Sequence, residues 1–197
     1  MKLTLLDTGA GNLHSLGRAL QACGATVVVE TDPRRCLGVQ ALVLPGVGAF
    51  APAAERLAPA RAELAQALRD GLPCLAICLG MQLLLTSSEE GAGEGLSVLS
   101  GRVERLRARR VPHMGWNSLQ GEDCLLSASG LSVAYYAHSY RCAPDDGSAV
   151  RAVSQHEQLH IPALVRTART VGVQFHPEKS GPAGRRFLAE VLKEFQR

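Results

Sequence analysis

Cys78 is the residue whose surroundings best suit nucleophilic chemistry. It follows the apolar run 74–77, which is typical of a buried strand, and a helix is predicted to begin soon after it. A side chain on such a strand-to-helix turn stands on strained backbone, so its neighbours two residues before and after must be small, as Ala76 and Gly80 are. The start of the helix would favour a thiolate. Taken alone, Cys78 is equally compatible with a small buried hydrophobic residue.

A histidine and a glutamate far along the chain offer the partners that a thiol nucleophile needs. In His176-Pro177-Glu178, the proline favours extended backbone at His176, so that residues 176 and 178 project to the same side. Glu178 would then accept a hydrogen bond from the imidazole while His176 faces the thiol. An isolated His-Pro-Glu is more often a surface loop, but together with Cys78 it predicts a Cys-His-Glu triad.

The elements that must position these residues alternate between strand and helix in the first half of the chain. Strand-like apolar runs lie at 3–6, 26–30, 41–44 and 72–77. Helical spacing marks 13–23 and 53–68, the second divided by Pro59, and a further helix begins over 81–85. Such alternation predicts a parallel sheet with both faces covered by helices.

The second half of the chain is richer in strands. Strand-like pieces follow one another at 98–106, 131–136, 149–153, 163–167 and 171–175, and a helix over 184–195 ends the chain. We therefore predict an α/β fold, a three-layer αβα sandwich with a mostly parallel central sheet and extra strands added to it from the C-terminal half. A length of 197 residues favours a single domain, 1–197.

Composition excludes several classes of protein. The net charge is only +3, and the one basic cluster, Arg102 to Arg110, lacks the aromatic residues of a nucleic-acid site, so we expect a solvated face. No apolar run approaches the ~18 residues of a membrane span, and the N-terminal run is too short for a signal peptide. The six cysteines are scattered without paired spacing, which favours reduced thiols and a cytoplasmic protein.

One motif points toward a metal and is best interpreted otherwise. His156-Glu157-Gln158-Leu159-His160 matches the pattern of zinc peptidases, which need both histidines on one face of a helix. A strand is predicted just before it and Pro162 follows, so we expect neither a metal nor a cofactor here. Gly9 and Gly11 also lack the third glycine of a dinucleotide-binding turn.

The chain resembles the class I (triad) glutamine amidotransferases and, among them, the glutaminase subunits of imidazole glycerol phosphate synthase. The resemblance runs nearly from end to end. Its motifs are Asp7-Thr8-Gly9-Ala10-Gly11-Asn12, Pro45-Gly46-Val47-Gly48, the Cys78 segment, Ser88-Glu89-Glu90-Gly91, His113-Met114-Gly115-Trp116-Asn117, Tyr135-Tyr136-Ala137-His138-Ser139-Tyr140 and His176-Pro177-Glu178-Lys179-Ser180-Gly181. One departure is Ala76, where the family usually has glycine.

The resemblance implies a reaction and a partner. Cys78 would attack the side-chain amide of L-glutamine, and His176, oriented by Glu178, would protonate the departing ammonia. Backbone amides of Leu79 and Val47 would form the oxyanion hole. The glutamine would be held by Gly48, Gln82, Glu90, Ser139 and Tyr140. Ammonia would pass to a TIM-barrel cyclase subunit that binds at Asn12, Trp116, Tyr135 and Lys179. A glutaminase serving another synthase and an inactive, amidotransferase-like binding subunit remain as alternatives.

Overall fold

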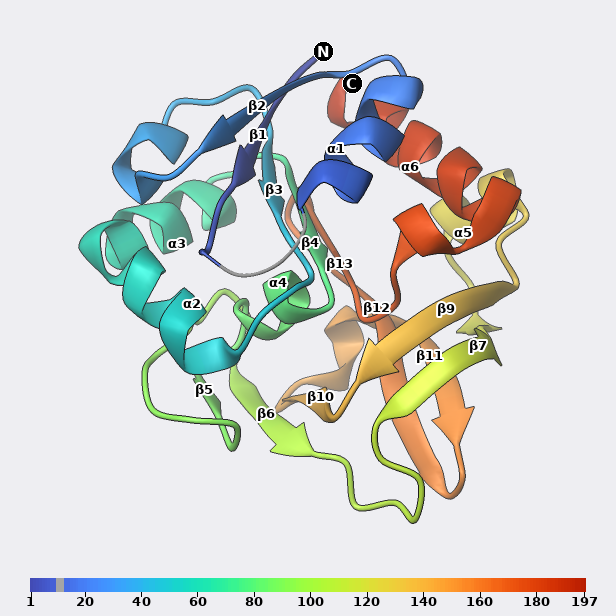
Figure 1. The fold of residues 1–197 in the computed structure, drawn as a ribbon. Helices are drawn as coiled ribbons and strands as arrows, with labels where there is room; N and C mark the ends of the chain where they lie inside the picture. Colours follow the sequence, from blue (N-terminus) through green and yellow to red (C-terminus); the bar gives the residue numbers. More distant parts are fainter. Residues whose placement is uncertain (10–12) are drawn as a thin grey trace.

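The computed structural model describes residues 1–9 and 13–197, and its centre is an eight-stranded sheet (Figure 1). The strand order is β2-β1-β3-β4-β13-β12-β11-β8. The first five strands run parallel and the remaining three continue the sheet antiparallel. The strands are β1 (Lys2–Leu6), β2 (Thr26–Glu30), β3 (Leu42–Leu44), β4 (Cys74–Ile77), β8 (Gln120–Gly121), β11 (Val150–His156), β12 (Leu159–Thr167) and β13 (Thr170–Val173).

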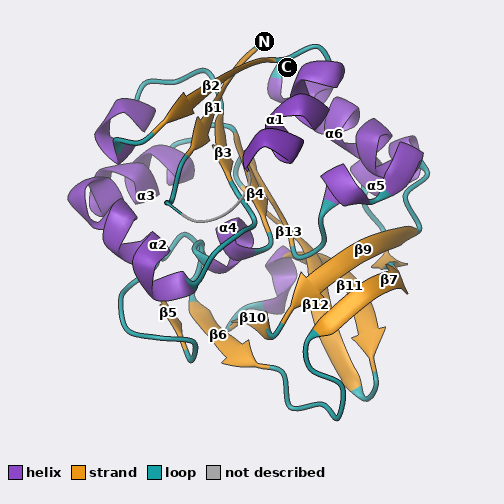
Figure 2. Ribbon diagram, viewed as in Figure 1, coloured by secondary structure: helices purple, strands orange, loops and turns teal. Residues whose placement is uncertain are grey.

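Helices cover both faces of this sheet (Figure 2). On one face lie α1 (Leu13–Ala22), α5 (Cys124–Ser129) and α6 (Gly181–Phe195); on the other lie α2 (Phe50–Leu57), α3 (Arg61–Arg69) and α4 (Leu79–Gln82). Successive strand residues enter opposite cores: Leu75 and Ile77 pack with α1 and α6, whereas Cys74 and Ala76 pack with α2 and α3. Because side chains alternate across a strand, a parallel strand covered on both faces must be apolar throughout. The predicted three-layer α/β fold is confirmed.

The helix that was expected over 53–68 is divided as Pro59 requires. A 3-10 turn at Ala58–Ala60 separates α2 from α3, since a proline inside a helix removes a hydrogen-bond donor and clashes with the preceding turn. The helix expected over 81–85 is different. It begins at Leu79, directly after the nucleophile candidate, and ends at Gln82 after one turn. The described residues hold no helix long and apolar enough to cross a membrane.

The C-terminal half adds β8, β11, β12 and β13 to the central sheet, as predicted, and two small sheets lie outside it. One has the order β10-β6-β5, with β10 at Tyr140–Pro144, β6 at Gly101–Arg105 and β5 at Ser87–Ser88. The other pairs β7 (His113–Ser118) with β9 (Val133–His138), an antiparallel pair that we call the ribbon (Figure 1). The runs 98–106 and 131–136 do form strands, but in these small sheets, and β7, β10 and α5 were not predicted.

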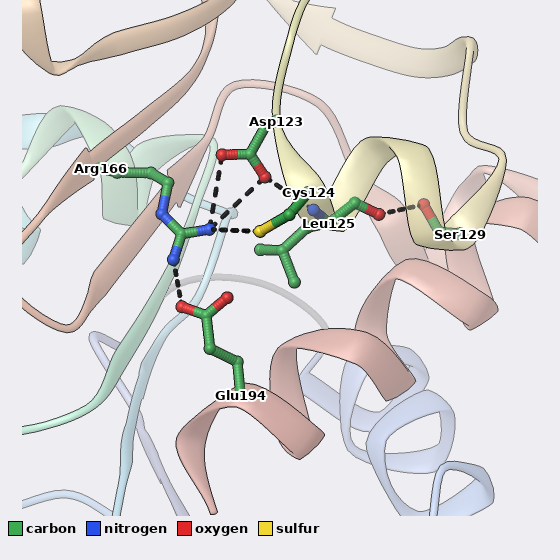
Figure 3. Close-up of polar contacts among 6 residues, drawn as sticks. All are labelled: Asp123, Cys124, Leu125, Ser129, Arg166 and Glu194. Atoms are coloured by element: carbon green, nitrogen blue, oxygen red, sulfur yellow. Dashed lines mark hydrogen bonds and ion pairs between the residues drawn. The ribbon is translucent and has the colours of Figure 1, made fainter. Parts of the chain in front are cut away.

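An ion-pair cluster ties the antiparallel part of the sheet to two helices (Figure 3). Arg166 of β12 lies 3.4 Å from the Asp123 carboxylate and also pairs with Glu194 near the end of α6. Asp123 in turn caps α5, accepting a hydrogen bond of 2.8 Å from the Leu125 amide. One guanidinium therefore joins β12, the start of α5 and the end of α6.

Replacing Arg166 by alanine should destabilise the protein substantially. The Asp123 side chain is only 5% exposed, so losing its partner leaves a carboxylate poorly solvated and unpaired. We expect a loss of about 2–4 kcal/mol in the free energy of unfolding, measured by urea denaturation. Arg102→Ala, which breaks an exposed pair with Glu104, is the control and should cost less than about 1 kcal/mol. Equal effects of the two variants would contradict a special role for Arg166.

Candidate active site

The strained turn at Cys78 exists because α4 packs directly against the end of β3. Cys78 has φ 46° and ψ −101°, a positive φ that non-glycine residues rarely adopt. The Gly80 amide donates a hydrogen bond of 3.0 Å to the Pro45 carbonyl. A Cβ at Gly80 would lie 2.3 Å from the Leu44 carbonyl oxygen, and a Cβ at Gly46 would lie 2.9 Å from the Ile77 side chain. Side chains at these glycines would force the turn apart, as the sequence pattern predicted for position 80.

His176 reaches Cys78 because β13 runs parallel to β4 as its neighbour. Val173 pairs with Ile77, so both chains leave the sheet at the same edge. The backbone at His176 is extended, with φ −102° and ψ 95°, as its position before Pro177 predicted. Its amide donates a hydrogen bond of 2.8 Å to the Tyr135 carbonyl of the ribbon. The backbone at His176 is thus held from the sheet side and from the ribbon side.

Glu178 lies behind the imidazole, on a 3-10 turn formed by Pro177–Lys179. The distance from His176 Nδ1 to Glu178 Oε1 is 2.9 Å, and both side chains are nearly buried. Burial alone lowers the pKa of His176, but hydrogen bonds and charge interactions with the Cys78 sulfur and the Glu178 carboxylate outweigh it and raise the pKa to about 9. His176 is therefore protonated at neutral pH. The sulfur, imidazole and carboxylate stand in the order that nucleophile, base and orienting group require.

A cavity of about 410 Å³ opens in front of the sulfur. It gathers both residues predicted for the oxyanion hole and all five predicted for glutamine binding, although they come from distant parts of the chain. The cavity is lined by Gly46, Val47, Gly48, Cys78, Leu79, Gln82, Glu90, Pro112, Met114, Ala137, His138, Ser139, Tyr140, His176 and Lys179.

Three of the four residues predicted for the partner interface also lie together, at the rim of this cavity. Trp116 is 60% exposed and so does not belong to the core, and its ring lies 6.0 Å from that of Tyr135. The Lys179 ammonium is 6.0 Å from the centre of the Tyr135 ring, and Lys179 lines the cavity as well. Asn12 lies outside the described residues. We call Met114, Trp116, Tyr135 and Lys179 the rim cluster.

The motif that resembled a zinc peptidase has another structure. His156 ends β11 and His160 belongs to β12, so the two histidines lie on a hairpin and not on a helix. Glu157, with φ 53°, accepts hydrogen bonds from the backbone amides of Arg109 and Arg110. Within residues 1–9 and 13–197, no group of three or more His, Cys, Asp and Glu side chains is arranged to hold a metal ion. The arginines of the basic cluster are exposed, as expected of a solvated face.

Sequence reasoning missed three buried polar residues around the site. Gln174 contacts the sulfur of Cys78, and His138 and His113 contact one another beside the cavity. His113 and His138 stand within motifs that carry the family resemblance and Gln174 lies two residues before one, yet their residue types alone indicate no role. For His113 and His138, the available signal was a polar residue at a strand position that faces inward, and for His113 this required knowing that β7 is a strand.

The fold and the arrangement of the site are those of α/β enzymes that carry a nucleophile on a strand-to-helix turn. The chain belongs to one family of that design, the class I glutamine amidotransferases, whose family model matches residues 4–195.

Relatives within that family are similar over nearly their whole length. The imidazole glycerol phosphate synthase subunit HisH of Synechococcus elongatus is 40% identical, with 98% of this chain and 93% of the relative covered. The HisH subunit of Natronomonas pharaonis is 42% identical, with coverage of 97% and 94%.

Solved structures of lower identity share the fold. A structure described as PurLQS from Thermotoga maritima matches with a TM-score of 0.73 at 18% identity, covering 98% of this chain and 97% of that one. A glutamine amidotransferase crystal structure matches with a TM-score of 0.71 at 19% identity, covering 96% and 98%.

Titration of His176 tests the electrostatics of the site independently of turnover. Its imidazole signal, followed by NMR, should titrate near pH 9. Glu178→Gln should move that midpoint to lower pH, because the variant removes a negative charge that stabilises the imidazolium. Burial lowers the pKa of His113 to about 4, so His113 should not titrate between pH 6 and 10 and serves as the internal control. An unchanged midpoint in Glu178→Gln would refute the role of the carboxylate.

Proposed function

We propose that this chain is the glutaminase subunit of an imidazole glycerol phosphate synthase. In this proposal it hydrolyses glutamine to glutamate and ammonia and delivers the ammonia to a cyclase subunit. The observation that carries the proposal is the imidazole of His176, which contacts the sulfur of Cys78 and lies 2.9 Å from the carboxylate of Glu178. The HisH relatives support the choice of synthase. The family match over residues 4–195 supports treating the chain as one domain.

The proposed reaction uses the proton held by His176. Cys78, as the thiolate paired with protonated His176, attacks the amide carbon of glutamine, and the carbonyl oxygen becomes negative. His176 gives its proton to the nitrogen, so that ammonia leaves and a thioester remains. A water molecule then gives a proton to His176 as it attacks the thioester carbon. Collapse of this second intermediate expels the Cys78 thiolate and releases glutamate, and His176 stays protonated for the next cycle.

The oxyanion needs backbone donors, and two candidates lie beside the sulfur. The Leu79 amide belongs to the first turn of α4, where amides have no partner within the helix. The second would be the amide of Val47, next to Gly48, whose φ of +115° is open to glycine alone. Glycine makes reorientation of this peptide inexpensive, so we propose that partner binding switches the donor into place. Loss of one such donor typically lowers the rate by about 10²–10³.

The remaining cavity residues would hold the amino acid. Gln82 is buried at the cavity wall, and its side chain donates a hydrogen bond of 3.1 Å to the Tyr140 carbonyl. Glu90 is held by the Phe50 amide at 2.8 Å, which directs its carboxylate beside the Val47–Gly48 segment. A fixed carboxylate suits the ammonium group of glutamine, and Ser139 and Tyr140 border the other side of the cavity.

Ammonia transfer explains where the partner should bind. In bulk water ammonia is mostly protonated and no longer nucleophilic, so the partner should close the cavity from its rim. The rim cluster offers an exposed tryptophan beside a tyrosine and a lysine, and aromatic residues of this kind anchor interfaces. We therefore propose that a TIM-barrel cyclase subunit docks on Trp116, Tyr135 and Lys179, with Asn12 as a further contact.

Replacement of the nucleophile should separate the two half-reactions. In a complex with the cyclase, Cys78→Ala should abolish glutamine-dependent synthesis because no thioester forms. Synthesis from added ammonium salt should persist at the wild-type rate, measured by formation of imidazole glycerol phosphate. Cys74→Ala is a suitable control, since Cys74 is buried in the core four residues earlier. If Cys78→Ala still used glutamine, or if the wild-type complex never did, the proposal would fail.

Truncation of the exposed tryptophan should weaken the complex. Trp116→Ala should lower the affinity for the cyclase at least about tenfold, measured by isothermal titration calorimetry, because central aromatic anchors supply much of the binding energy. Val29→Ala provides the matched control: Val29 is 53% exposed but lies on the edge strand β2, at the end of the sheet away from the ribbon. Equal affinity of the Trp116→Ala variant and the wild type would refute docking on the rim cluster.

A further inference from the structure

Gln174 is a completely buried amide whose side chain ends at the nucleophile. It follows β13 directly, and its side chain has 0% exposure. Its Nε2 lies 3.5 Å from the sulfur of Cys78, and its Oε1 lies 3.5 Å from Nε2 of Gln82. A buried amide is costly unless it is hydrogen-bonded, and both recorded contacts of this side chain are with residues of the cavity. The side chain at position 174 is therefore a buried polar group that faces the Cys78 sulfur.

A backbone carbonyl fixes which end of this amide faces the sulfur. The Tyr140 carbonyl can only accept, so the Gln82 side chain must turn its NH₂ group toward it, at 3.1 Å. The other hydrogen of that NH₂ group is directed at the Gln174 amide, which must present its oxygen to receive it. Gln174 is then left with its own NH₂ group toward Cys78. In this orientation of the two amides, the sulfur faces a hydrogen-bond donor.

Two neutral histidines hold the Tyr140 carbonyl in place. His138 donates from Nδ1 to that carbonyl at 2.8 Å, so its Nε2 must accept, and His113 Nδ1 is the donor at 3.0 Å. His113 Nε2 in turn accepts from the Asn117 amide at 3.1 Å. Each ring thus has one defined tautomer. Burial lowers the pKa of His138 to about 3 and that of His113 to about 4, which keeps both rings neutral and the polarity of the network intact.

We propose that Gln174 is a further catalytic residue of the reaction described above, donating a hydrogen bond from Nε2 to the Cys78 sulfur when that sulfur is negatively charged. The inference rests on the proposed function. The sulfur carries charge at two points: after its proton has moved to His176, and again when the tetrahedral intermediate formed from the thioester and water collapses and the carbon–sulfur bond breaks. A donor at the sulfur stabilises both states. His138 and His113 are positioning residues, since they act through Tyr140, Gln82 and Gln174.

The chemical reactivity of Cys78 tests this role without glutamine. The probe is iodoacetamide at neutral pH, with the carboxamidomethylated Cys78 peptide quantified by mass spectrometry, because the chain has other free cysteines. Gln174→Met keeps the volume but removes the donor, and Gln174→Asn keeps the amide but withdraws it from the sulfur. Each variant should alkylate Cys78 about tenfold more slowly, the effect expected of one hydrogen bond to a charged group.

Ser129→Ala is the matched control, because it removes a buried hydrogen bond to the Leu125 carbonyl far from the cavity (Figure 3). It should lower the melting temperature and leave the alkylation rate unchanged, which separates a loss of stability from a loss at the sulfur. In the complex with the cyclase, the Gln174 variants should lose about tenfold in kcat for glutamine, with KM within about threefold of the wild type.

A wild-type alkylation rate in either Gln174 variant, with native near-ultraviolet circular dichroism, would overturn the proposal. A Gln174 variant that loses native structure is set aside, and the other decides. The outcome is distinguishable from failure of the proposed function: a wild-type complex without glutaminase activity would defeat that function, while the alkylation rates would still show whether Gln174 acts on the sulfur.

Discussion

The close approach of α4 to the end of β3 is the constraint on which the site depends. Gly80 lies so near the Leu44 carbonyl that no side chain fits between them, and the chain at Cys78 must adopt a positive φ to make this turn. Strain of this kind costs on the order of 1–3 kcal/mol and persists only where the surrounding packing determines it. Here the apolar cores on both faces of β4 supply that packing, and the sulfur is held at the edge of the sheet as a result.

The parallel register of β4 and β13 determines where His176 lies relative to Cys78. Because parallel neighbours end at the same edge, the residues that follow Ile77 and Val173 must meet there. The ribbon closes the arrangement from outside the sandwich. Its Tyr135 carbonyl accepts from the His176 amide, and its Tyr135 amide donates to the Ser180 hydroxyl at 2.9 Å. The sandwich thus positions the sulfur and the imidazole, while the ribbon adds the wall that bears Met114, Trp116 and Tyr135 of the rim cluster.

The interior of the site holds a connected network of buried polar side chains. Gln174, Gln82, His138 and His113 form one network in which each donor meets an acceptor, and the Tyr140 carbonyl sets its direction. A fully connected network in a medium of low dielectric constant is stiff, since reversing any member would leave a buried group unpaired. The same stiffness makes the surroundings of the sulfur well defined before any substrate enters.

The sequence by itself determined the features that arise from local backbone demands and continuous apolar patterns. Each of these features depends on only a few neighbouring residues. They are the turn at Cys78 between Ala76 and Gly80, the extended backbone of His176 before Pro177, the break between two helices at Pro59, and the apolar strand β4. The family resemblance added the cavity residues. Only the tertiary structure decided the ribbon and the polar network. In β7 the polar His113 is buried while Trp116 is exposed, which inverts the usual pattern of a strand. The pairing of His113 with His138, and of Gln174 with Cys78, joins residues far apart in the chain, and such contacts form only when packing brings their strands together.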